Sequence, residues 1–460
     1  MDRIIIVGSG LVGSLLSIFL ARRDYSVQVF DKKPDLRTSP LPSGRSINLT
    51  ICHRGFQALD RVGAGDRVRA ISTPAYGRRV HGENGEVVFQ PYGNRGEALH
   101  AITRNELNRV LLDVAAKQHG VEFRFRHKCL GIDLSAPALT FENLDTGQLA
   151  TERPAVVLGA DGAFSTVRQQ MLRSERFDCS QEYIQQGYKE LTIPSGVVRA
   201  SGLERHALHI WPRGRYMLIG FANFDGSTTL ALHLPYEGSE PSFASIRSES
   251  DLLGLFARSF PDALPLLPQL VGNYFGRPVS SMLTVRCFPW VRGKVALIGD
   301  AAHAIVPSYG QGANAGFEDC AVLDAALDRH AGDWEKALAD YQRERKPNAD
   351  LIAGLSLQHF SEIRDRLNDP RFLIRKAVER RLDEIYPGRF TSLYSLISFT
   401  GMSYVEALAR TAKQEAIVDR ILTVDDLAER FAQGTMDAVL HEHACGDPGA
   451  VASPYGSATS

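Results

Sequence analysis

The strongest constraint on the fold lies in residues 1–31. An apolar stretch at residues 3–7 leads into a glycine-rich turn, and an amphipathic helix pattern follows the turn. The turn carries Gly8, Gly10 and Gly13 in a GxGxxG spacing. The first glycine allows a tight bend, the second lets the backbone approach a pyrophosphate, and the third lets the helix pack on the strand. The pattern predicts a Rossmann-like unit that binds a dinucleotide.

An acidic residue follows where the dinucleotide would need it. The second strand pattern, SVQVFD, ends at Asp31, 18 residues after Gly13, where a carboxylate accepts a hydrogen bond from a ribose hydroxyl. The helix N-terminus at Leu11 and Val12 presents unpaired N–H groups to the phosphates. Lys32 completes this set of candidate cofactor-binding residues. The loop predicts an ADP-containing dinucleotide but leaves FAD and NAD undistinguished.

A second glycine-rich strand–turn–helix pattern, LIGDAAHAIVPSYGQGANAGFEDC, distinguishes the two cofactors. An apolar strand delivers Asp300 to a sheet edge, where its carboxylate can accept a hydrogen bond from a sugar-alcohol hydroxyl. Beyond Pro307 a Gly-Gln-Gly turn exposes N–H groups, and the helix that begins near Ala313 points its positive end the same way. Such an end stabilises negative charge on a reduced flavin ring. NAD needs no second site of this kind, whereas FAD does, so the sequence predicts FAD.

A third motif lies between these two. In VVLGADGAFSTVRQQM, a strand pattern ends at Asp161, and Ser165 and Arg168 open the next helix as a capped start. GxGxxG, this DGxxSxxR pattern and GDAAHxxxP at residues 299–307 together resemble the single-component, FAD-dependent aromatic hydroxylases of the 4-hydroxybenzoate hydroxylase-like group.

The resemblance adds residues to the predicted cofactor site. It implies that Arg45 and Arg104 contact the FAD phosphates or the surroundings of the ring, and that the backbone near Cys129 lines the adenine. The complete prediction for cofactor binding is Gly8, Gly10, Leu11, Val12, Gly13, Asp31, Lys32, Arg45, Arg104, Cys129, Asp161, Asp300, Gly312, Ala313 and Asn314.

Within that group, five stretches are similar to the kynurenine 3-monooxygenase branch: GRSINLT, ITRNELNRVLLD, GYKELTIP, ALHIWP and GQGANAGFEDC. The resemblance implies that Arg78, Tyr92 and Tyr394 hold the amino-acid carboxylate of the substrate. The chemistry agrees, because a guanidinium fork pairs with a carboxylate through two hydrogen bonds and phenol hydroxyls can donate to it. His359 stands where the branch has an asparagine, and is the fourth candidate here.

The ring pocket departs from the branch. The branch turn Pro-Phe-[Phe/His]-Gly-Gln-Gly-Met-Asn reads here with Ser308, Tyr309 and Ala313. His233 stands in a strand where an aromatic wall residue is usual, and it is the fifth residue predicted to bind the substrate. These exchanges predict a roomier and more polar pocket beside the flavin. We therefore expect L-kynurenine to be a poor or uncoupling substrate, and a ring with an additional polar substituent to couple better.

These features together predict an FAD-dependent monooxygenase that hydroxylates an electron-rich aromatic carboxylate, kynurenine or a kynurenine- or anthranilate-like compound. NADPH or NADH would reduce the flavin, and O2 would form a C4a-hydroperoxide that attacks the ring. The residues predicted to act at the flavin are Tyr309, Gln311 and Gly312.

Two alternatives share the fold. A flavin-dependent halogenase would carry a WxWxIP signature, and Trp211, Trp290 and Trp334 are isolated. The other alternative is a non-catalytic, flavin-holding binding protein similar to the GDP-dissociation inhibitors, or a reductase of the same fold. Asp300 and the Gly-Gln-Gly turn argue against a non-catalytic protein.

The predicted fold class is α/β: a Rossmann-like FAD-binding domain with an inserted β-sheet substrate domain and a C-terminal helical region. The predicted FAD-binding domain is discontinuous and comprises residues 1–70, 100–175 and 286–345. Residues 71–99 and 176–285 form the β-rich domain, 346–445 the helical region, and 446–460 a flexible tail.

Composition excludes several classes of binding partner. A net charge of -1 gives no basic footprint for nucleic acid, and no apolar run approaches the roughly 18–20 residues that cross a bilayer. The N-terminus enters a strand pattern at once, and the six cysteines are scattered without a CxxC pair, which favours a reduced, cytoplasmic protein. His441, His443 and Cys445 lie in a polar end, so we expect no metal. The expected partners are a small aromatic acid, O2 and NAD(P)H, and the expected assembly is a monomer or homodimer.

Overall fold

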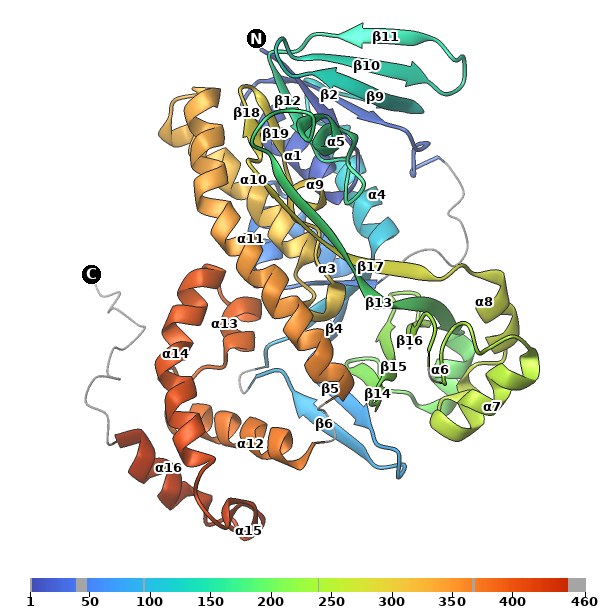
Figure 1. Ribbon diagram of the computed structural model, residues 1–460, viewed down its shortest axis with the longest axis vertical. Coiled ribbons are helices and arrows are strands. Elements are labelled where there is room, and N and C mark those ends of the chain that lie inside the picture. Colours follow the sequence, from blue (N-terminus) through green and yellow to red (C-terminus); the bar gives the residue numbers. More distant parts are fainter. Residues whose placement is uncertain (1, 39–47, 94–95, 239, 366–368, 446–460) are drawn as a thin grey trace.

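The computed structural model describes residues 2–38, 48–93, 96–238, 240–365 and 369–445. A six-stranded sheet, in the order β18-β19-β12-β1-β2-β8, forms the upper part of the molecule in Figure 1. Its strands are β1 (Arg3–Val7), β2 (Ser26–Asp31), β8 (Val121–Phe125), β12 (Val156–Gly159), β18 (Val291–Arg292) and β19 (Val295–Leu297). The neighbours pair in parallel except β18, which is antiparallel to β19. All residues of β12 and β19 are buried, as in parallel sheets covered on both faces.

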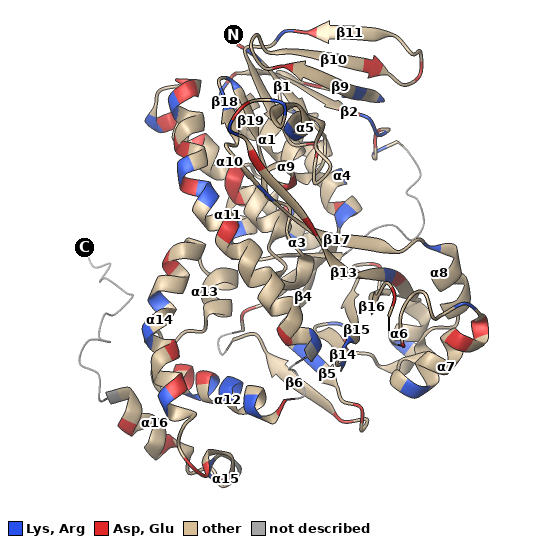
Figure 2. Ribbon diagram, viewed as in Figure 1, with Lys and Arg blue, Asp and Glu red and all other residues tan. Residues whose placement is uncertain are grey.

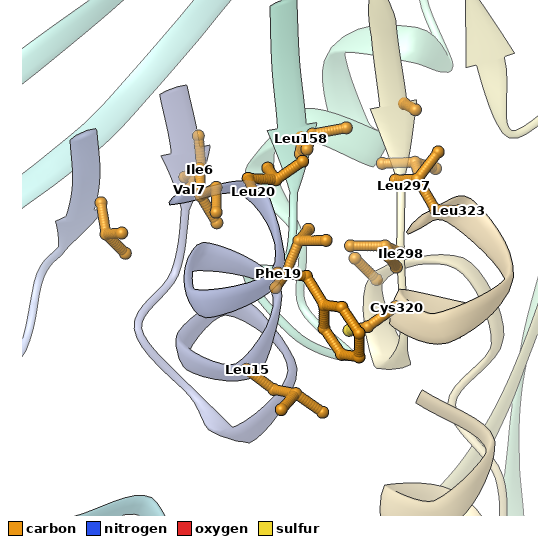
Figure 3. Close-up of a cluster of buried hydrophobic side chains, with 14 of the residues drawn as sticks. Ile6, Val7, Leu15, Phe19, Leu20, Leu158, Leu297, Ile298, Cys320 and Leu323 are labelled. Carbon is orange, nitrogen blue, oxygen red and sulfur yellow. The ribbon is translucent and has the colours of Figure 1, made fainter. Parts of the chain in front are cut away.

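Two helices hold the glycine turns of this sheet in a fixed relation. These are α1 (Leu11–Ala21), which follows β1, and α10 (Gly312–Arg329), which lies beside it. Figure 3 places Phe19 of α1 beside Ile298 and Cys320, and it also draws Leu15 of α1 and Leu323 of α10. All five side chains are at most 4% exposed, and each fully buried large apolar side chain contributes about 1.5–3 kcal/mol. The shared core therefore brings together two turns that lie about three hundred residues apart in the sequence.

Smaller elements surround the six-stranded sheet. One three-stranded sheet comprises β3 (Asn48–Ile51), β7 (Leu99–Thr103) and β4 (Thr73–Ala75), and the other comprises β9 (His127–Asp133), β10 (Ala138–Asn143) and β11 (Leu149–Glu152). The helices here are α2 (His53–Arg61), α3 (Gly65–Ala70), α4 (Arg104–Ala115) and α5 (Thr166–Met171).

A seven-stranded sheet, in the order β17-β13-β16-β15-β14-β5-β6, forms a second body. Its strands are β5 (Gly77–His81), β6 (Val87–Pro91), β13 (Asp178–Ile193), β14 (Leu208–Arg213), β15 (Tyr216–Ala222), β16 (Thr228–Pro235) and β17 (Ser280–Phe288). The helices α6 (Ser195–Ser201), α7 (Glu249–Ser259) and α8 (Leu270–Gly276) lie beside it. The long strands β13 and β17 run from this sheet toward the six-stranded sheet (Figure 1). At one edge of this sheet, β5 and β6 pair as an antiparallel hairpin.

The C-terminal part is helical, as predicted, but its first helix begins earlier than the sequence pattern indicated. That helix, α11 (Trp334–Asp365), continues through Pro347. It is followed by α12 (Pro370–Ile385), α13 (Leu393–Phe399), α14 (Tyr404–Ile421), α15 (Leu427–Ala432) and α16 (Met436–Cys445). Basic and acidic residues are interspersed along α11, α12 and α14 (Figure 2). The predicted α/β fold class with an added sheet and a helical C-terminal region is confirmed.

No helix in the described part of the chain combines the length and the apolarity needed to cross a bilayer.

Candidate active site

A single cavity, here called the chamber, runs from the first glycine turn to the face of the seven-stranded sheet. Gly10, Leu11, Val12 and Arg104 line one end. The turns after β19 line the middle, and strands β13, β15 and β16 line the far end. The residues from these parts include Asp300, Gly310, Gly312, Ala313, Tyr188, Met217, Ile219, Phe221, Ala231 and His233. Three regions of sequence therefore line one cavity.

The first glycine turn leaves its backbone open to this space. Gly8 has a φ of +104°, and a Cβ there would lie 2.5 Å from the carbonyl oxygen of Ala160. A Cβ on Gly13 would lie 1.9 Å from the carbonyl oxygen of Gly8. By contrast, a Cβ on Gly10 would meet nothing within 4 Å. Two glycines are thus required by protein packing, whereas Gly10 faces the open side, where a pyrophosphate can approach the backbone.

Asp31 lies beside the same turn. One carboxylate oxygen accepts hydrogen bonds from the backbone N–H of Ser9 at 2.7 Å and from its hydroxyl at 2.9 Å. The Lys32 side chain is exposed. Burial raises the pKa of Cys129 to about 12, so this residue is a neutral thiol, and it does not line the chamber. Arg45 lies outside the described residues.

The DGxxSxxR motif joins two parts of the site. Asp161 accepts a hydrogen bond from the N–H of Thr166 at 2.6 Å, and Ser165 caps α5 by accepting one from the N–H of Arg168 at 3.0 Å. The buried Arg168 guanidinium donates to the carbonyl oxygen of Ala301 at 2.7 Å, in the helix α9 (Asp300–His303). The second carboxylate oxygen of Asp161 is buried and has no partner among the described residues. Such an unpaired acceptor beside the chamber fits a donor hydroxyl of a bound sugar.

The turn after α9 exposes its backbone to the chamber. The side chains of two residues in this turn that were predicted to act at the cofactor, Gln311 and Asn314, point into the protein instead. Gln311 is 1% exposed, and its side-chain oxygen accepts a hydrogen bond from the Tyr404 hydroxyl at 3.0 Å. Asn314 is fully buried, donates to the carbonyl oxygens of Thr50 and Gly310 at 2.8 and 2.7 Å, and does not line the chamber. These two side chains brace the turn, and the surface offered to a ligand is the backbone at the start of α10.

A buried network of charged side chains supports this turn, and no local sequence pattern indicates it. Asp319 accepts hydrogen bonds from the N–H of Gly299 at 3.0 Å and from Arg345 at 2.7 Å, and its carboxylate lies 2.6 Å from His303. Burial alone would raise the pKa of Asp319, but His303 and Arg345 lower it to about 2. The carboxylate is therefore ionised and holds the residue that precedes Asp300.

Aromatic side chains gather at one side of the chamber. Tyr92 and Tyr394 stack with ring centroids 5.7 Å apart, and both line the chamber. Tyr309 lies 5.2 Å from Tyr394 and 4.8 Å from His359, measured between ring centroids. Burial raises the pKa of Tyr394 to about 12, and the positive charge of Arg78 opposes this rise. Burial raises the pKa of Tyr92 as well, so Tyr92 and Tyr394 are both neutral phenols that can donate hydrogen bonds.

Arg78 and His359 lie behind these rings and do not line the chamber themselves. The Nε of Arg78 donates to the side-chain oxygen of Gln90 at 2.8 Å. Burial lowers the pKa of His359, although Glu362 lies 3.5 Å from its Nδ1. The structure thus brings four of the five predicted substrate-binding residues to one side, and His233 lies apart from them on β16.

Several residues that line the chamber were not predicted. They include Asn48, Leu49, Thr50, Leu208, Met217, Ile219, Phe221, Phe360 and Ile363. The period-2 alternation in β15 carried a usable signal, because Met217, Ile219 and Phe221 occupy alternate positions and face the same side.

Comparison with known proteins agrees with this geometry. The sequence profile of a family described as an FAD binding domain matches residues 2–192 and 275–355. A kynurenine 3-monooxygenase of Flavobacterium johnsoniae is 43% identical over 426 residues, which cover 92% of this chain and 95% of that protein. One from Myxococcus xanthus is 45% identical over 422 residues, 91% of this chain and 90% of that protein.

The chain belongs to the kynurenine 3-monooxygenase family of FAD-dependent aromatic hydroxylases. Its cofactor is FAD, and its activity is that of an FAD-dependent aromatic monooxygenase, as the sequence predicted. Solved structures share the fold at lower identity. A 2-methyl-3-hydroxypyridine-5-carboxylic acid oxygenase in its tetrameric form has a TM-score of 0.65 at 23% identity, covering 83% of this chain and 96% of its own. A p-nitrophenol 4-monooxygenase from Pseudomonas putida has a TM-score of 0.64 at 20% identity, covering 83% and 94%.

Proposed function

We propose that this monooxygenase hydroxylates the ring of an aromatic amino acid of the kynurenine class and holds its carboxylate with Arg78, Tyr92 and Tyr394. These three residues are called the carboxylate clamp below. The observation that carries the proposal is the state of Arg78. Its only hydrogen bond within the described residues goes from Nε to the neutral Gln90, so its terminal nitrogens lack a carboxylate partner there.

The neighbouring arginine provides the contrast. Arg79, on the opposite face of β5, pairs with Glu204 through two of its nitrogens at 3.0 and 2.6 Å. Alternation along the strand thus gives one arginine a counter-ion from the protein and leaves the other beside two phenols that face the chamber. A substrate carboxylate would provide the missing partner, because a guanidinium fork and phenol donors match its oxygens.

The residues present also fit FAD. For this site we propose that the open backbone at Gly10, with Asp31 and Arg104 nearby, holds the ADP part, and that Asp161 and Asp300 accept hydrogen bonds from its sugar hydroxyls. The N-terminus of α10 would stabilise negative charge on the ring. Bound FAD supplies the redox chemistry and the activation of O2. The apolar strand residues at the far end of the chamber would exclude water while the substrate ring is held in place.

The remaining assignments are proposals of the same kind. NADPH or NADH would visit the site transiently, since the described chain has one GxGxxG turn. The domain division at residues 1–70, 100–175 and 286–345 follows the two glycine turns that form the cofactor site. Five cysteines among the described residues are free thiols, which supports the proposal of a reducing compartment such as the cytoplasm.

The test compares L-kynurenine with kynuramine, which lacks the carboxylate. We expect the wild-type holoenzyme to bind the acid about 10- to 100-fold more tightly, because a charge-assisted pair contributes about 1.5–3 kcal/mol. Arg78→Gln should remove most of this preference, and Arg79→Gln, the matched control, should keep it. Dissociation constants would come from the change in flavin absorbance on binding. If Arg78→Gln discriminates as well as the wild type, the clamp is wrong.

A further inference from the structure

His233 occupies an unusual place in the chamber wall. It lies on β16, where its backbone neighbours are Tyr188 of β13 and Met217 of β15. Alternation along the strand puts it on the same face as Ala231, and both residues line the chamber. Its ring centroid lies 5.5 Å from that of Tyr188 and 6.0 Å from that of Phe360. An imidazole thus stands among aromatic and apolar side chains.

The hydrogen bonds of this imidazole are missing. Its Nδ1 is buried without a partner, and no described residue forms a hydrogen bond with Nε2. The other buried histidines differ. His81 lies 2.7 Å from a carboxylate oxygen of Asp262, the Nε2 of His209 lies 2.8 Å from a backbone carbonyl oxygen, and His303 pairs with Asp319. Among the buried histidines that the structure describes, only His233 has no polar partner.

The protonation state of His233 defines what it can offer. Burial lowers its pKa to about 4, so the ring is neutral near pH 7, with one N–H donor and one acceptor. Leaving a buried group such as Nδ1 unpaired costs about 1–3 kcal/mol. A phenylalanine would fill similar space without that cost. A histidine at this position is therefore explained if a ligand in the chamber supplies the missing hydrogen-bond partner.

The position of His233 shows which part of a ligand it would meet. His359 and Phe360 are consecutive on α11 and diverge: His359 contacts the rings of Tyr309 and Tyr394, whereas Phe360 contacts His233. The aromatic cluster beside the carboxylate clamp and the wall around His233 are thus separate parts of the chamber. A substrate whose carboxylate lies at the clamp would extend its aromatic ring toward β16.

We propose that His233 is a specificity-determining residue that forms a hydrogen bond with a polar substituent on the aromatic ring of the substrate. This inference rests on the proposed function, because it uses the clamp to orient the ligand. In kynurenine the ring amine and the neighbouring ketone can hydrogen bond to each other, and the other open ring positions carry only C–H groups. The preferred ligand is therefore a kynurenine-class acid with an additional ring hydroxyl, which can both donate and accept.

The experiment measures dissociation constants for L-kynurenine and for its 3-, 4- and 5-hydroxy derivatives, from flavin absorbance without NAD(P)H. The wild-type holoenzyme should bind at least one hydroxylated ligand about 10-fold more tightly than L-kynurenine, since one hydrogen bond is worth about that factor. His233→Phe should reduce this preference to about twofold or less while changing the affinity for L-kynurenine less than about threefold. His233→Asn, which keeps a donor and an acceptor, should retain part of the preference.

The outcomes separate this inference from the proposed function. If aromatic acids bind with dependence on Arg78 but hydroxylation makes no difference, His233 does not have this role and the proposed function stands. The same holds if His233→Phe weakens L-kynurenine and its hydroxylated forms equally, because the residue would then recognise a group common to both. If kynuramine binds as well as the acids do, the clamp fails and this inference fails with it. FAD content and Tm of each variant verify that the fold is intact.

Discussion

Replacement of Asp319 by asparagine tests whether the buried charge network holds the second glycine turn. Asp319 is fully buried, and Arg345, one of its partners, is 2% exposed. Asparagine keeps the size of the side chain but has one acceptor oxygen and a donor NH2 group. It therefore cannot accept from Gly299, His303 and Arg345 together, and the guanidinium loses one of its two counter-ions, the other being Glu318 at 2.6 Å.

The expected loss of stability follows from these contacts. Removing one partner of a buried ion pair costs about 3–5 kcal/mol. Unfolding entropy of about 2.1 cal/mol/K per residue gives roughly 1 kcal/mol/K for a chain of 460 residues. Asp319→Asn should therefore lower Tm by about 3–5 °C in a thermal melt of the holoenzyme. Because Gly299 precedes Asp300, the variant should also lose FAD more readily on dialysis.

The pH dependence of Tm at acidic pH tests whether the ionised Asp319 carboxylate causes the difference in stability. The folded-state pKa of Asp319 is lowered to about 2, below the unfolded value of about 3.9. Its contribution is thus fully present above about pH 4 and is lost as the pH falls toward 2. The Tm difference between wild type and variant should be steady between about pH 5 and 8 and narrow on acidification. Asp66→Asn, which removes an exposed partner of Arg69, should shift Tm by less than about 1 °C. An equally small shift for Asp319→Asn would refute the reasoning.

Two further predictions concern the same turn. Asp300→Ala should weaken FAD binding about 10-fold or more, because a hydrogen bond to a charged acceptor is worth about 1.5–3 kcal/mol; quenching of FAD fluorescence measures this, and full FAD retention would place the cofactor elsewhere. Tyr404→Phe removes the 3.0 Å hydrogen bond to Gln311, which should lower stability by about 1 kcal/mol and raise the ratio of hydrogen peroxide to hydroxylated product. Unchanged Tm and coupling would show that Gln311 needs no such support.

The cofactor turns could be predicted because glycine leaves a strong local signal. The spacing of Gly8, Gly10 and Gly13 fixes where backbone is tight and where it is open, and the neighbours of each glycine in the structure agree with the assigned roles. The orientation of a polar side chain beside such a turn has no comparable signal. Gln311 and Asn314 are adjacent in sequence to the chamber-lining backbone, yet both point into the protein.

The sequence pattern could not predict contacts between distant segments. Arg54 is 2% exposed, pairs with Glu318 at 2.6 Å, and donates to the carbonyl oxygens of Ile397 and Met402. It thereby joins α2, α10 and the C-terminal helices. In the sequence Arg54 is one arginine among many, because burial and partners arise only once these segments are packed together.

The polar exchanges in the ring pocket illustrate the same limit. Ser308 and His233 look alike in the sequence, since each puts a polar group where the branch has an aromatic one. In the structure the Ser308 hydroxyl donates to the carbonyl oxygen of Ser356, so the protein itself satisfies it. His233 has no such partner among the described residues. A polar residue that finds its partner within the fold can change pocket shape without recognising anything polar, whereas an unpaired one carries a cost that a matching ligand group would offset. Of the two exchanges, only His233 is therefore expected to select between ring substituents.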